Sequence, residues 1–341
     1  KTGYIRINRF GATTAEEFKK AMTALQKQGM KDLILDLQGN GGGYLNAAID
    51  LANEFLGQKE LIVYTEGRTA QRSEFFAKGN GDFRTGRLII LVDEYTASAS
   101  EIVSGAVQDW DRGIIVGRRS FGKGLVQRPI DLPDGSMIRL TIARYYTPAG
   151  RCIQKPYDSS TDYNKDLIER FNHGELMNAD SIHFPDSLKV QTKKLGRTVY
   201  GGGGIMPDYF VPIDTTLYTD YHRNLVAKGA VIKFTMKFIE GHRKELANKY
   251  KKFESFNEKF IIDDDMLATL REMGEKEGVK FNEEQYQKSL PLIKTQLKAL
   301  IARDLWDMNE YFRVMNTTNE SVQKALEILN SEEYQKKLRA N

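Results

Sequence analysis

One local pattern occurs twice in the sequence: a short apolar run, a tight turn, and a segment whose apolar residues have helical spacing. The first copy begins with LILDL at 33–37, continues through GNGGG and predicts a helix over 44–55. The second begins with LIILV at 88–92, continues through DEYTAS and predicts a helix over 99–110. Strands that alternate with helices in this way are typical of an α/β fold with a buried sheet.

Other extended segments surround these two copies. Apolar runs at 4–7 and 113–117 predict further strands, and the turn LPDG leads into a long strand predicted over 137–146. These segments predict a mixed sheet with antiparallel additions. The polar, irregular stretch at 158–200 predicts a surface excursion, after which GGGGIMPDYFVP at 201–212 returns to extended structure.

The chain changes character near residue 214. Beyond this point it is rich in Lys and Glu, with apolar residues at helical spacing, and Pro291 is predicted to lie in the first turn of a helix. We therefore expect two domains in this chain of 341 residues. The first is an α/β core over 1–214, which includes the polar excursion, and the second is a mainly helical accessory region over 215–341.

The composition excludes several classes of partner. With 50 Lys and Arg against 46 Asp and Glu, the net charge is +4, which is too balanced to predict binding of nucleic acid or anionic lipid. The aliphatic run at 88–92 is far shorter than the roughly 20 residues of a membrane-spanning helix, so no transmembrane segment is expected. The single cysteine, Cys152, excludes an internal disulfide and has no activating histidine nearby in sequence.

Ser98 lies where the second strand and turn lead into a helix. With Glu101 it fits a capping box, an arrangement that contributes about 1 kcal/mol to helix stability and requires no catalysis. A serine at a sharp junction between a strand and a helix is also placed like the nucleophile of a nucleophile elbow, although the G-x-S-x-G sequence is absent. In that case the amide of Ala99 would point toward an oxygen bound beside the serine.

The glycine turn at 39–43 follows the other buried strand. If the two strands are parallel neighbours, both turns lie at the carboxyl edge of the sheet, where sites of α/β folds form. Glycine amides of this turn could then supply a second oxyanion donor. The alternatives are a plain tight turn or a phosphate-binding turn, but G-x-G-x-x-G and a G-K-[ST] ending are both missing. No cofactor and no metal site are predicted.

A nucleophilic serine needs a base. The four histidines all follow the α/β section, so a Ser-His-Asp arrangement would require the later segments. Lys123 is the other candidate, because its glycine neighbours permit close backbone approach and burial favours a neutral lysine. Gln127 would point to the same face of a strand and could orient the lysine. From the residues alone, a surface lysine beside a flexible turn remains an alternative.

Several of these motifs together resemble one known family. The resemblance is to the C-terminal processing peptidases, also called tail-specific proteases. Its motifs, in chain order and in the order found in that family, are LILDLQGNGGGYLNAAIDLANEFL, TASASEI, GRRSFGKGLVQ, YTPAGRCIQ and GGGGIMPDYFVP. The resemblance covers about residues 2–155 and resumes at 201–212. It implies a Ser-Lys serine peptidase whose core, with a mixed sheet flanked by helices, is related to the crotonase and Clp protease architecture.

The resemblance also implies a role for each site residue. Ser98 would be the nucleophile, Lys123 the general base, and Gln127 the residue that holds the lysine. The oxyanion hole would consist of the amides of Ala99 and of a glycine in the turn, for which we select Gly42. Ser100 is the rival nucleophile, but its spacing from the lysine differs by two residues from the family pattern.

The expected substrates and location follow from the family. Members cleave proteins or peptides with accessible C-termini in the cell envelope or periplasm, usually with a PDZ domain upstream of the first strand seen here, and we expect that domain to lie upstream. An adaptor, a regulator or an oligomer would fit the same scheme. Two alternatives stay open: a binding or scaffold protein of the same fold that no longer cleaves, and a crotonase-like acyl-CoA enzyme.

Overall fold

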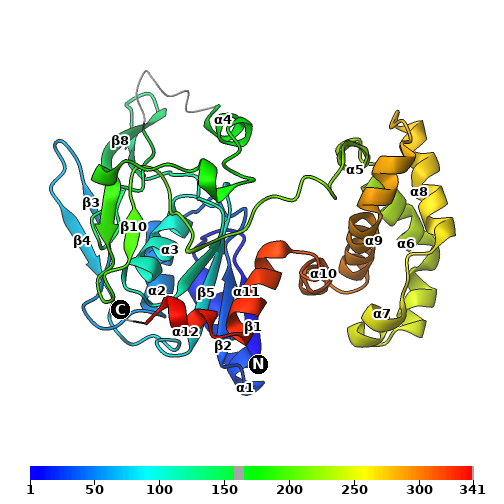
Figure 1. Ribbon diagram of the computed structural model, residues 1–341, viewed down its shortest axis with the longest axis horizontal. Helices are drawn as coiled ribbons and strands as arrows, with labels where there is room; N and C mark the ends of the chain where they lie inside the picture. The colour runs from blue at the N-terminus through cyan, green and yellow to red at the C-terminus, as the bar shows by residue number, and fades with distance from the viewer. Residues whose placement is uncertain (157–164, 340–341) are drawn as a thin grey trace. The chain divides into compact units, whose positions relative to one another are not determined.

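The computed structural model describes residues 1–156 and 165–339 (Figure 1). Two compact units are present. The first consists of residues 1–212 together with the segment from Lys324 onward, and the second, here called the helical unit, spans Ile213–Gln323. The expected boundary near 214 falls close to the end of the first stretch. The segment from Lys324 onward, which the sequence placed in the helical region, belongs instead with the first unit.

The first unit contains a five-stranded sheet in which every neighbouring pair is parallel. Its order is β1 (Thr2–Arg6), β2 (Asp32–Asp36), β5 (Arg87–Val92), β6 (Ile114–Gly117) and β11 (Tyr209–Phe210). The two predicted strands β2 and β5 are direct neighbours, with Asp36 opposite Leu91. The turns that follow them therefore lie at the same edge of the sheet, as the sequence analysis required.

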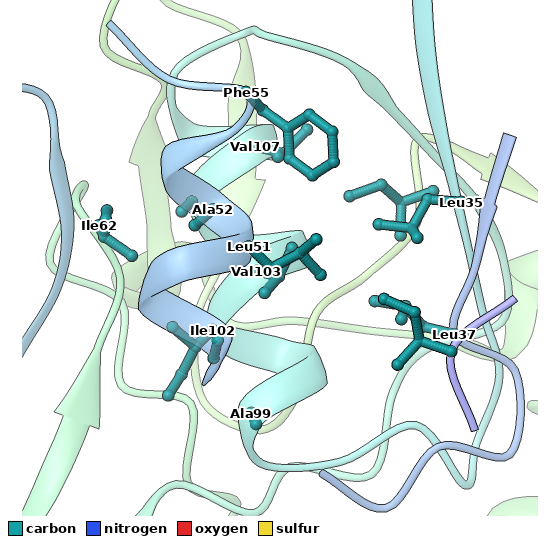
Figure 2. Packing of buried hydrophobic residues seen from close by; sticks show 14 of the residues in the cluster. Leu35, Leu37, Leu51, Ala52, Phe55, Ile62, Ala99, Ile102, Val103 and Val107 are labelled. Carbon is teal, nitrogen blue, oxygen red and sulfur yellow. The ribbon is translucent and has the colours of Figure 1, made fainter. Parts of the chain in front are cut away.

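Three helices cover one face of this sheet: α1 (Thr14–Lys27), α2 (Leu45–Asn53) and α3 (Ala99–Asp109). Figure 2 shows Leu51 of α2 and Val103 of α3 facing Leu35 and Leu37. All four are fully buried, and each such side chain stabilises the fold by about 2 kcal/mol. Ile34, Ile89 and Leu91, which alternate with the core-facing residues, are buried as well. Both faces are therefore covered, as is usual for parallel sheets.

The expected antiparallel strands form a separate sheet. Its order is β4 (Ser73–Phe76), β3 (Leu61–Glu66), β8 (Met137–Tyr146) and β7 (Leu125–Asp131). Strand β8 has the bounds that the sequence predicts. The pairing of β7 with β8 shifts register between Val126 and Gln127. These strands are thus not additions to the parallel sheet, because among the described residues none of them pairs with a strand of that sheet.

The polar stretch predicted as a surface excursion has ordered structure. It contains α4 (Asp166–Asn172), the 3-10 turns η1 (Ala179–Ser181) and η2 (Asp186–Leu188), and a small hairpin of β9 (Lys189–Gln191) and β10 (Thr198–Tyr200). The part at 157–164 lies outside the described residues. Arg170, Glu175 and Leu176 are buried, so this stretch contributes side chains to the interior of the first unit.

The helical unit confirms the expected helical region. Its helices are α5 (Asp220–Ala227), α6 (Ala230–Lys249), α7 (Phe253–Lys259), α8 (Asp264–Lys276), α9 (Glu283–Leu305) and α10 (Met308–Met315). The prediction for Pro291 is wrong, because it lies inside α9 and not in its first turn. Asn282 starts the helix by accepting a hydrogen bond from the Gln285 amide, and the proline follows more than two turns later.

Helix α11 (Glu320–Asn330) leads back into the first unit, followed by α12 (Glu333–Lys337). The hydroxyl of Tyr334 accepts from the amide of Leu88 at 2.9 Å, and Arg87 Nη1 donates to the carbonyl oxygen of Leu329 at 2.7 Å. These helices thus bind the beginning of β5. Among the helices in the described parts of the chain, none combines the length and apolar character needed to cross a bilayer.

Candidate active site

Three loops meet at the carboxyl edge of the parallel sheet, one after each of β2, β5 and β6. Asp93 joins the first two, because its Oδ1 accepts from the amide of Gly39 at 2.9 Å and from the hydroxyl of Thr96 at 3.1 Å. The third loop joins the second through the amide of Phe121, which donates to the Thr96 carbonyl oxygen at 2.9 Å. Burial raises the pKa of Asp93, against the lowering effect of the hydrogen bonds from backbone amides.

Ser98 lies on the second loop, directly before α3. Its backbone has φ 57° and ψ −116°, a conformation that residues other than glycine rarely adopt. Such strain persists only where the surrounding structure enforces it, and it is frequent at active sites. The side chain is half-buried, and the next residue, Ala99, opens the helix. The local geometry is therefore that of a strained turn between a strand and a helix, as in a nucleophile elbow.

The glycine turn packs directly on this serine. A Cβ atom placed on Gly42 would lie 2.7 Å from Ser98 Cβ and 2.9 Å from the amide nitrogen of Ala99. The φ of Gly42 is 95°, which also favours glycine. Because glycine has no side chain, the Gly42 main chain can lie against both the serine and the first amide of α3. A larger residue would not fit at this position.

The amide of Gly42 has a partner in this conformation. It donates to Asn40 Oδ1 at 2.8 Å. Asn40 is fully buried, its Nδ2 donates to the carbonyl oxygen of Ile7 at 2.6 Å, and its own carbonyl oxygen accepts from the Ala97 amide at 2.9 Å. Asn40 therefore fixes the glycine turn against the loop of Ser98. The Gly42 amide is occupied by this side chain and does not point at empty space.

Glu101 connects the loop of Ser98 with the loop of Lys123. Its Oε2 accepts from the amides of Ser98 and Lys123, both at 2.8 Å. Its Oε1 accepts from the Gly122 amide at 2.6 Å and from the Ser120 hydroxyl at 2.5 Å. The side chain is fully buried, which raises the pKa of the carboxyl although all four hydrogen bonds act to lower it. One carboxylate thus brings the main chains of both predicted catalytic residues together.

Lys123 lies in the loop that precedes β7, and its side chain is exposed. Glycine is required on both sides: a Cβ on Gly122, whose φ is 85°, would lie 3.0 Å from the amide of Gly204, and one on Gly124 would lie 2.5 Å from the amide of Gln154. Gln127 is exposed on β7, and the described residues contain no hydrogen bond between it and Lys123. The structure brings together Ser98, Ala99, Gly42 and the Lys123 main chain, but not the Gln127 side chain.

The two rival nucleophiles are less well placed. Ser100 is fully buried in α3, and its hydroxyl donates to the carbonyl oxygen of Asn40 at 3.1 Å. It supports the glycine turn. Burial raises the pKa of the Cys152 thiol, which is the opposite of what a nucleophilic thiolate requires.

Sequence reasoning missed three residues that assemble this site. Glu101 was recognised only as part of a cap, yet two further amides and a hydroxyl bind to it. Asn40 and Asp93 were read only as parts of turns. Their chemistry gave a weak signal, because Asn and Asp commonly bind backbone amides in turns. Which distant amides they bind depends on the pairing of β2 with β5, which no local pattern specifies.

Two segments of the chain match protein families. Residues 1–161 match peptidase family S41, and residues 221–307 match a family of unknown function, DUF8443. The first match contains Gly42, Ser98, Lys123 and Gln127. The second lies wholly within the helical unit.

Curated relatives resemble mainly the first unit. A carboxyl-terminal-processing protease of Picosynechococcus sp. is 44% identical over 155 residues, covering 46% of this chain and 37% of the relative. A chloroplastic C-terminal processing peptidase of Tetradesmus obliquus is 41% identical over 153 residues, covering 45% and 33%. A probable CtpA-like serine protease of Staphylococcus aureus is 30% identical over 279 residues, covering 79% and 53%. The chain thus spans about a third to a half of these relatives.

One solved structure is similar in sequence to part of the chain. The photosystem II D1 C-terminal processing protease is 40% identical, covers 45% of this chain and 39% of its own, and superposes with a TM-score of 0.43. The S41 match, the relatives and the order of the motifs agree on the N-terminal part of the molecule. Residues 1–161 of this chain match peptidase family S41 and are similar to its carboxyl-terminal-processing proteases.

Proposed function

We propose that the protein is a serine endopeptidase that cleaves C-terminal regions of proteins through Ser98 and Lys123. The observation that carries this proposal is the strained backbone of Ser98 at the start of α3, joined to the loop of Lys123 by Glu101. The names of the relatives support the activity and the substrate class. We further propose that residues 1–214 form the catalytic core and that the helical region after them has an accessory role.

The proposed chemistry uses these groups in turn. Neutral Lys123 takes the proton from Ser98 Oγ, which attacks the carbonyl carbon of the scissile peptide bond. The carbonyl oxygen of the substrate then becomes an oxyanion next to the amides of Ala99 and Gly42. When the carbon–nitrogen bond breaks, the lysinium gives its proton to the leaving amine and an acyl-enzyme remains. Water then attacks the ester, with Lys123 again accepting a proton, and Ser98 is restored.

Two features of the site define what substrate binding has to change. Lys123 is exposed to solvent, and a neutral lysine is favoured only where water is excluded. We propose that the bound polypeptide covers Lys123 and that Gln127 then orients its Nζ. The Gly42 amide donates to Asn40, so it must share its hydrogen with the substrate oxygen or exchange partners. Each oxyanion donor contributes about 3 kcal/mol in acyl transfer.

The partners and location are further parts of the proposal. Substrates are proteins with accessible C-termini, in a compartment outside the cytoplasm such as the cell envelope or periplasm. Chloroplastic relatives support a location of this kind. An adaptor or an oligomer would fit the exposed state of Lys123, because either could complete the desolvation of the site.

A mass-spectrometric time course on an unstructured protein with an apolar C-terminus tests the proposal. The parent, Ser98→Ala, Lys123→Ala and the matched control Lys20→Ala, an exposed lysine of α1, are compared. We expect cleavage by the parent and the control, and a loss of about 10⁴-fold or more in the two site variants, because members of a catalytic unit are indispensable together. Circular dichroism must show that all four fold. Equal cleavage by all variants would overturn the proposal.

A second candidate is a binding protein of the same fold that does not cleave. The exposure of Lys123 favours it, because the described structure does not bury the side chain that the peptidase would use as its base. Covalent labelling of Ser98 by a fluorophosphonate separates the candidates. Labelling that needs Lys123 supports the peptidase, whereas peptide binding without labelling or cleavage, unchanged in Ser98→Ala, supports the binding protein.

A further inference from the structure

The loop that carries Lys123 receives support from the predicted surface excursion. Arg170, on α4, donates from Nη2 to the carbonyl oxygen of Arg119 at 2.7 Å and from Nη1 to that of Ser120 at 3.3 Å. Its side chain is only 4% exposed. A guanidinium that binds two successive carbonyl oxygens determines the direction of the main chain at that point.

Glu175 fixes the orientation of that guanidinium. Its Oε1 accepts from Arg170 Nε at 2.8 Å and from Arg119 Nε at 2.7 Å, and its Oε2 accepts from Arg119 Nη2 at 2.8 Å. Burial alone would raise the pKa of Glu175, but the hydrogen bonds and charges of the two arginines outweigh it and lower the pKa. The carboxylate therefore stays ionised at neutral pH. Arg119 in turn donates to the carbonyl oxygen of Gly203 at 3.0 Å.

The opposite end of the same loop has different partners. Glu101 binds the amides of Gly122 and Lys123, and Gln154 Oε1 accepts from the Gly124 amide at 2.9 Å. Two glycines within three residues leave the backbone conformationally free unless hydrogen bonds restrict it. The position of Lys123 relative to Ser98 therefore depends on side chains that bind the loop from outside.

We propose that Arg170 and Glu175 are positioning residues that hold the loop 119–124, and with it Lys123, at the distance from Ser98 that proton transfer requires. The inference rests on the proposed Ser-Lys function and extends it to a segment outside residues 1–161. Neither side chain touches substrate in this scheme. They act through the carbonyl oxygens of Arg119 and Ser120, whereas Glu101 binds the Ser120 hydroxyl and the amides of Gly122 and Lys123.

A purely structural role makes a different prediction. Removing one partner of a buried ion pair leaves an uncompensated charge and lowers stability, whereas a displacement of a catalytic group by about 1 Å reduces the rate about 100-fold. The positioning role therefore predicts a large loss of rate even in variants that remain folded. Arg197 offers a matched control: it pairs with Asp111 and Asp208 in the same unit and binds no residue of the loop.

The experiment compares the parent with R170M, R170K, E175Q and the control R197M. Kinetics on the cleaved substrate should show that kcat falls at least about tenfold in R170M with KM nearly unchanged, because the base is displaced while the binding surface remains. R170K keeps the charge without the planar fork, so its kcat should lie between the parent and R170M. A kcat of folded R170M within twofold of the parent, or an equal loss in R197M, would overturn the inference.

Hydrogen exchange at the amides of 122–124 provides a second readout that needs no activity. We expect exchange at least about tenfold faster in R170M than in the parent and R197M, with the amides of β5 unchanged. If the parent neither cleaves nor is labelled at Ser98, the proposed peptidase fails while this readout still decides the support of the loop. Unchanged exchange in R170M and E175Q overturns the positioning role. If R170M does not fold, R170K and E175Q carry the same comparison.

Discussion

The two units of the molecule differ in how deeply their most buried ion pairs lie. In the first unit, Arg151 and Asp109 form an ion pair whose side chains are 1% and 0% exposed. In the helical unit, Lys288 and Glu284 form a pair that is 54% and 79% exposed. Buried charges need specific, directional partners, whereas exposed pairs tolerate many geometries. The buried charges of the first unit lie where loops must keep a defined position.

The helical unit is held together by apolar and aromatic contacts. Phe256 is fully buried and stacks on Phe260 with ring centroids 4.7 Å apart. Tyr250 and Trp306 contact it edge-on at 5.5 Å and 5.3 Å. Such contacts need matching volume but little directionality. The comparison teaches that buried charges fix the direction of the loops they bind, whereas apolar packing constrains mainly the volume of the interior.

The largest effect on stability is expected from the aromatic cluster. Phe256→Ala should destabilise the helical unit by about 3–5 kcal/mol, because it removes a large buried side chain and leaves a cavity. Urea unfolding followed by circular dichroism measures the change. The control Ile261→Ala, at an exposed position of the same unit, should change stability by less than about 0.5 kcal/mol. Similar losses in both variants would contradict an aromatic core.

A loss of comparable or somewhat smaller size is expected from the buried ion pair. Arg151→Met leaves Asp109 buried without its cation and should destabilise the first unit by about 3–5 kcal/mol, although the Ala149 amide still donates to Asp109. Urea unfolding of the first unit gives the value. The double variant with Asp109→Leu should recover much of the loss. A cost below about 1 kcal/mol in the single variant would remove the contrast between the units.

A smaller, pH-dependent effect is expected at His222 in the helical unit. Burial lowers the pKa of this histidine, against the hydrogen bond from its Nε2 to Gln296 Oε1 at 2.7 Å. The unfolded chain binds a proton below about pH 6.5 while the folded unit does not, so stability falls as the pH drops below that value. Unfolding at pH 7.5 and pH 5 should show this fall, and His222→Gln should reduce it. A parent insensitive to pH in this range would show that His222 is not buried as a neutral group.

The smallest effect is expected from the exposed pairs of the helical unit. Lys288→Ala, which removes the partner of Glu284 one helical turn away, should cost no more than about 0.5 kcal/mol. High salt should remove the difference between the variant and the parent, because exposed charges are screened. Thermal unfolding at low and high salt provides the measurement. A loss as large as that of Arg151→Met would mean that the two units do not differ in the way described.

The elements that surround the site were largely predictable from the sequence. LILDL and LIILV are strands, helices follow both turns, and the bounds of β8 agree, because apolar periodicity and glycine turns are local signals. The junction at Ser98 was predictable for the same reason. The strained φ of Ser98 and its contact with Gly42 depend on β2 and β5 being neighbours in the sheet. The spacing of apolar residues along the sequence does not predict which strands are neighbours.

The support of the site was not predictable. Arg170 and Glu175 lie in a polar stretch typical of a surface, and they are buried only because Arg119 and two carbonyl oxygens satisfy them. The prediction for Pro291 failed because proline is frequent in the first turn of helices. In the structure Asn282 caps α9 more than two turns earlier, so Pro291 lies inside the helix. In both places a distant or preceding partner outweighed the preference of the local sequence.

The return of the chain to the first unit after the helical unit has a consequence for biosynthesis. When residue 323 is added to the growing chain, the sequence of the helical unit is complete, but Tyr334, which binds the start of β5, has not yet been made. The α/β unit begins first and is completed last. Translation thus completes the helical unit while the parallel sheet still lacks its final helices, so a product that ends at residue 323 would contain the helical unit without the segment that binds the start of β5.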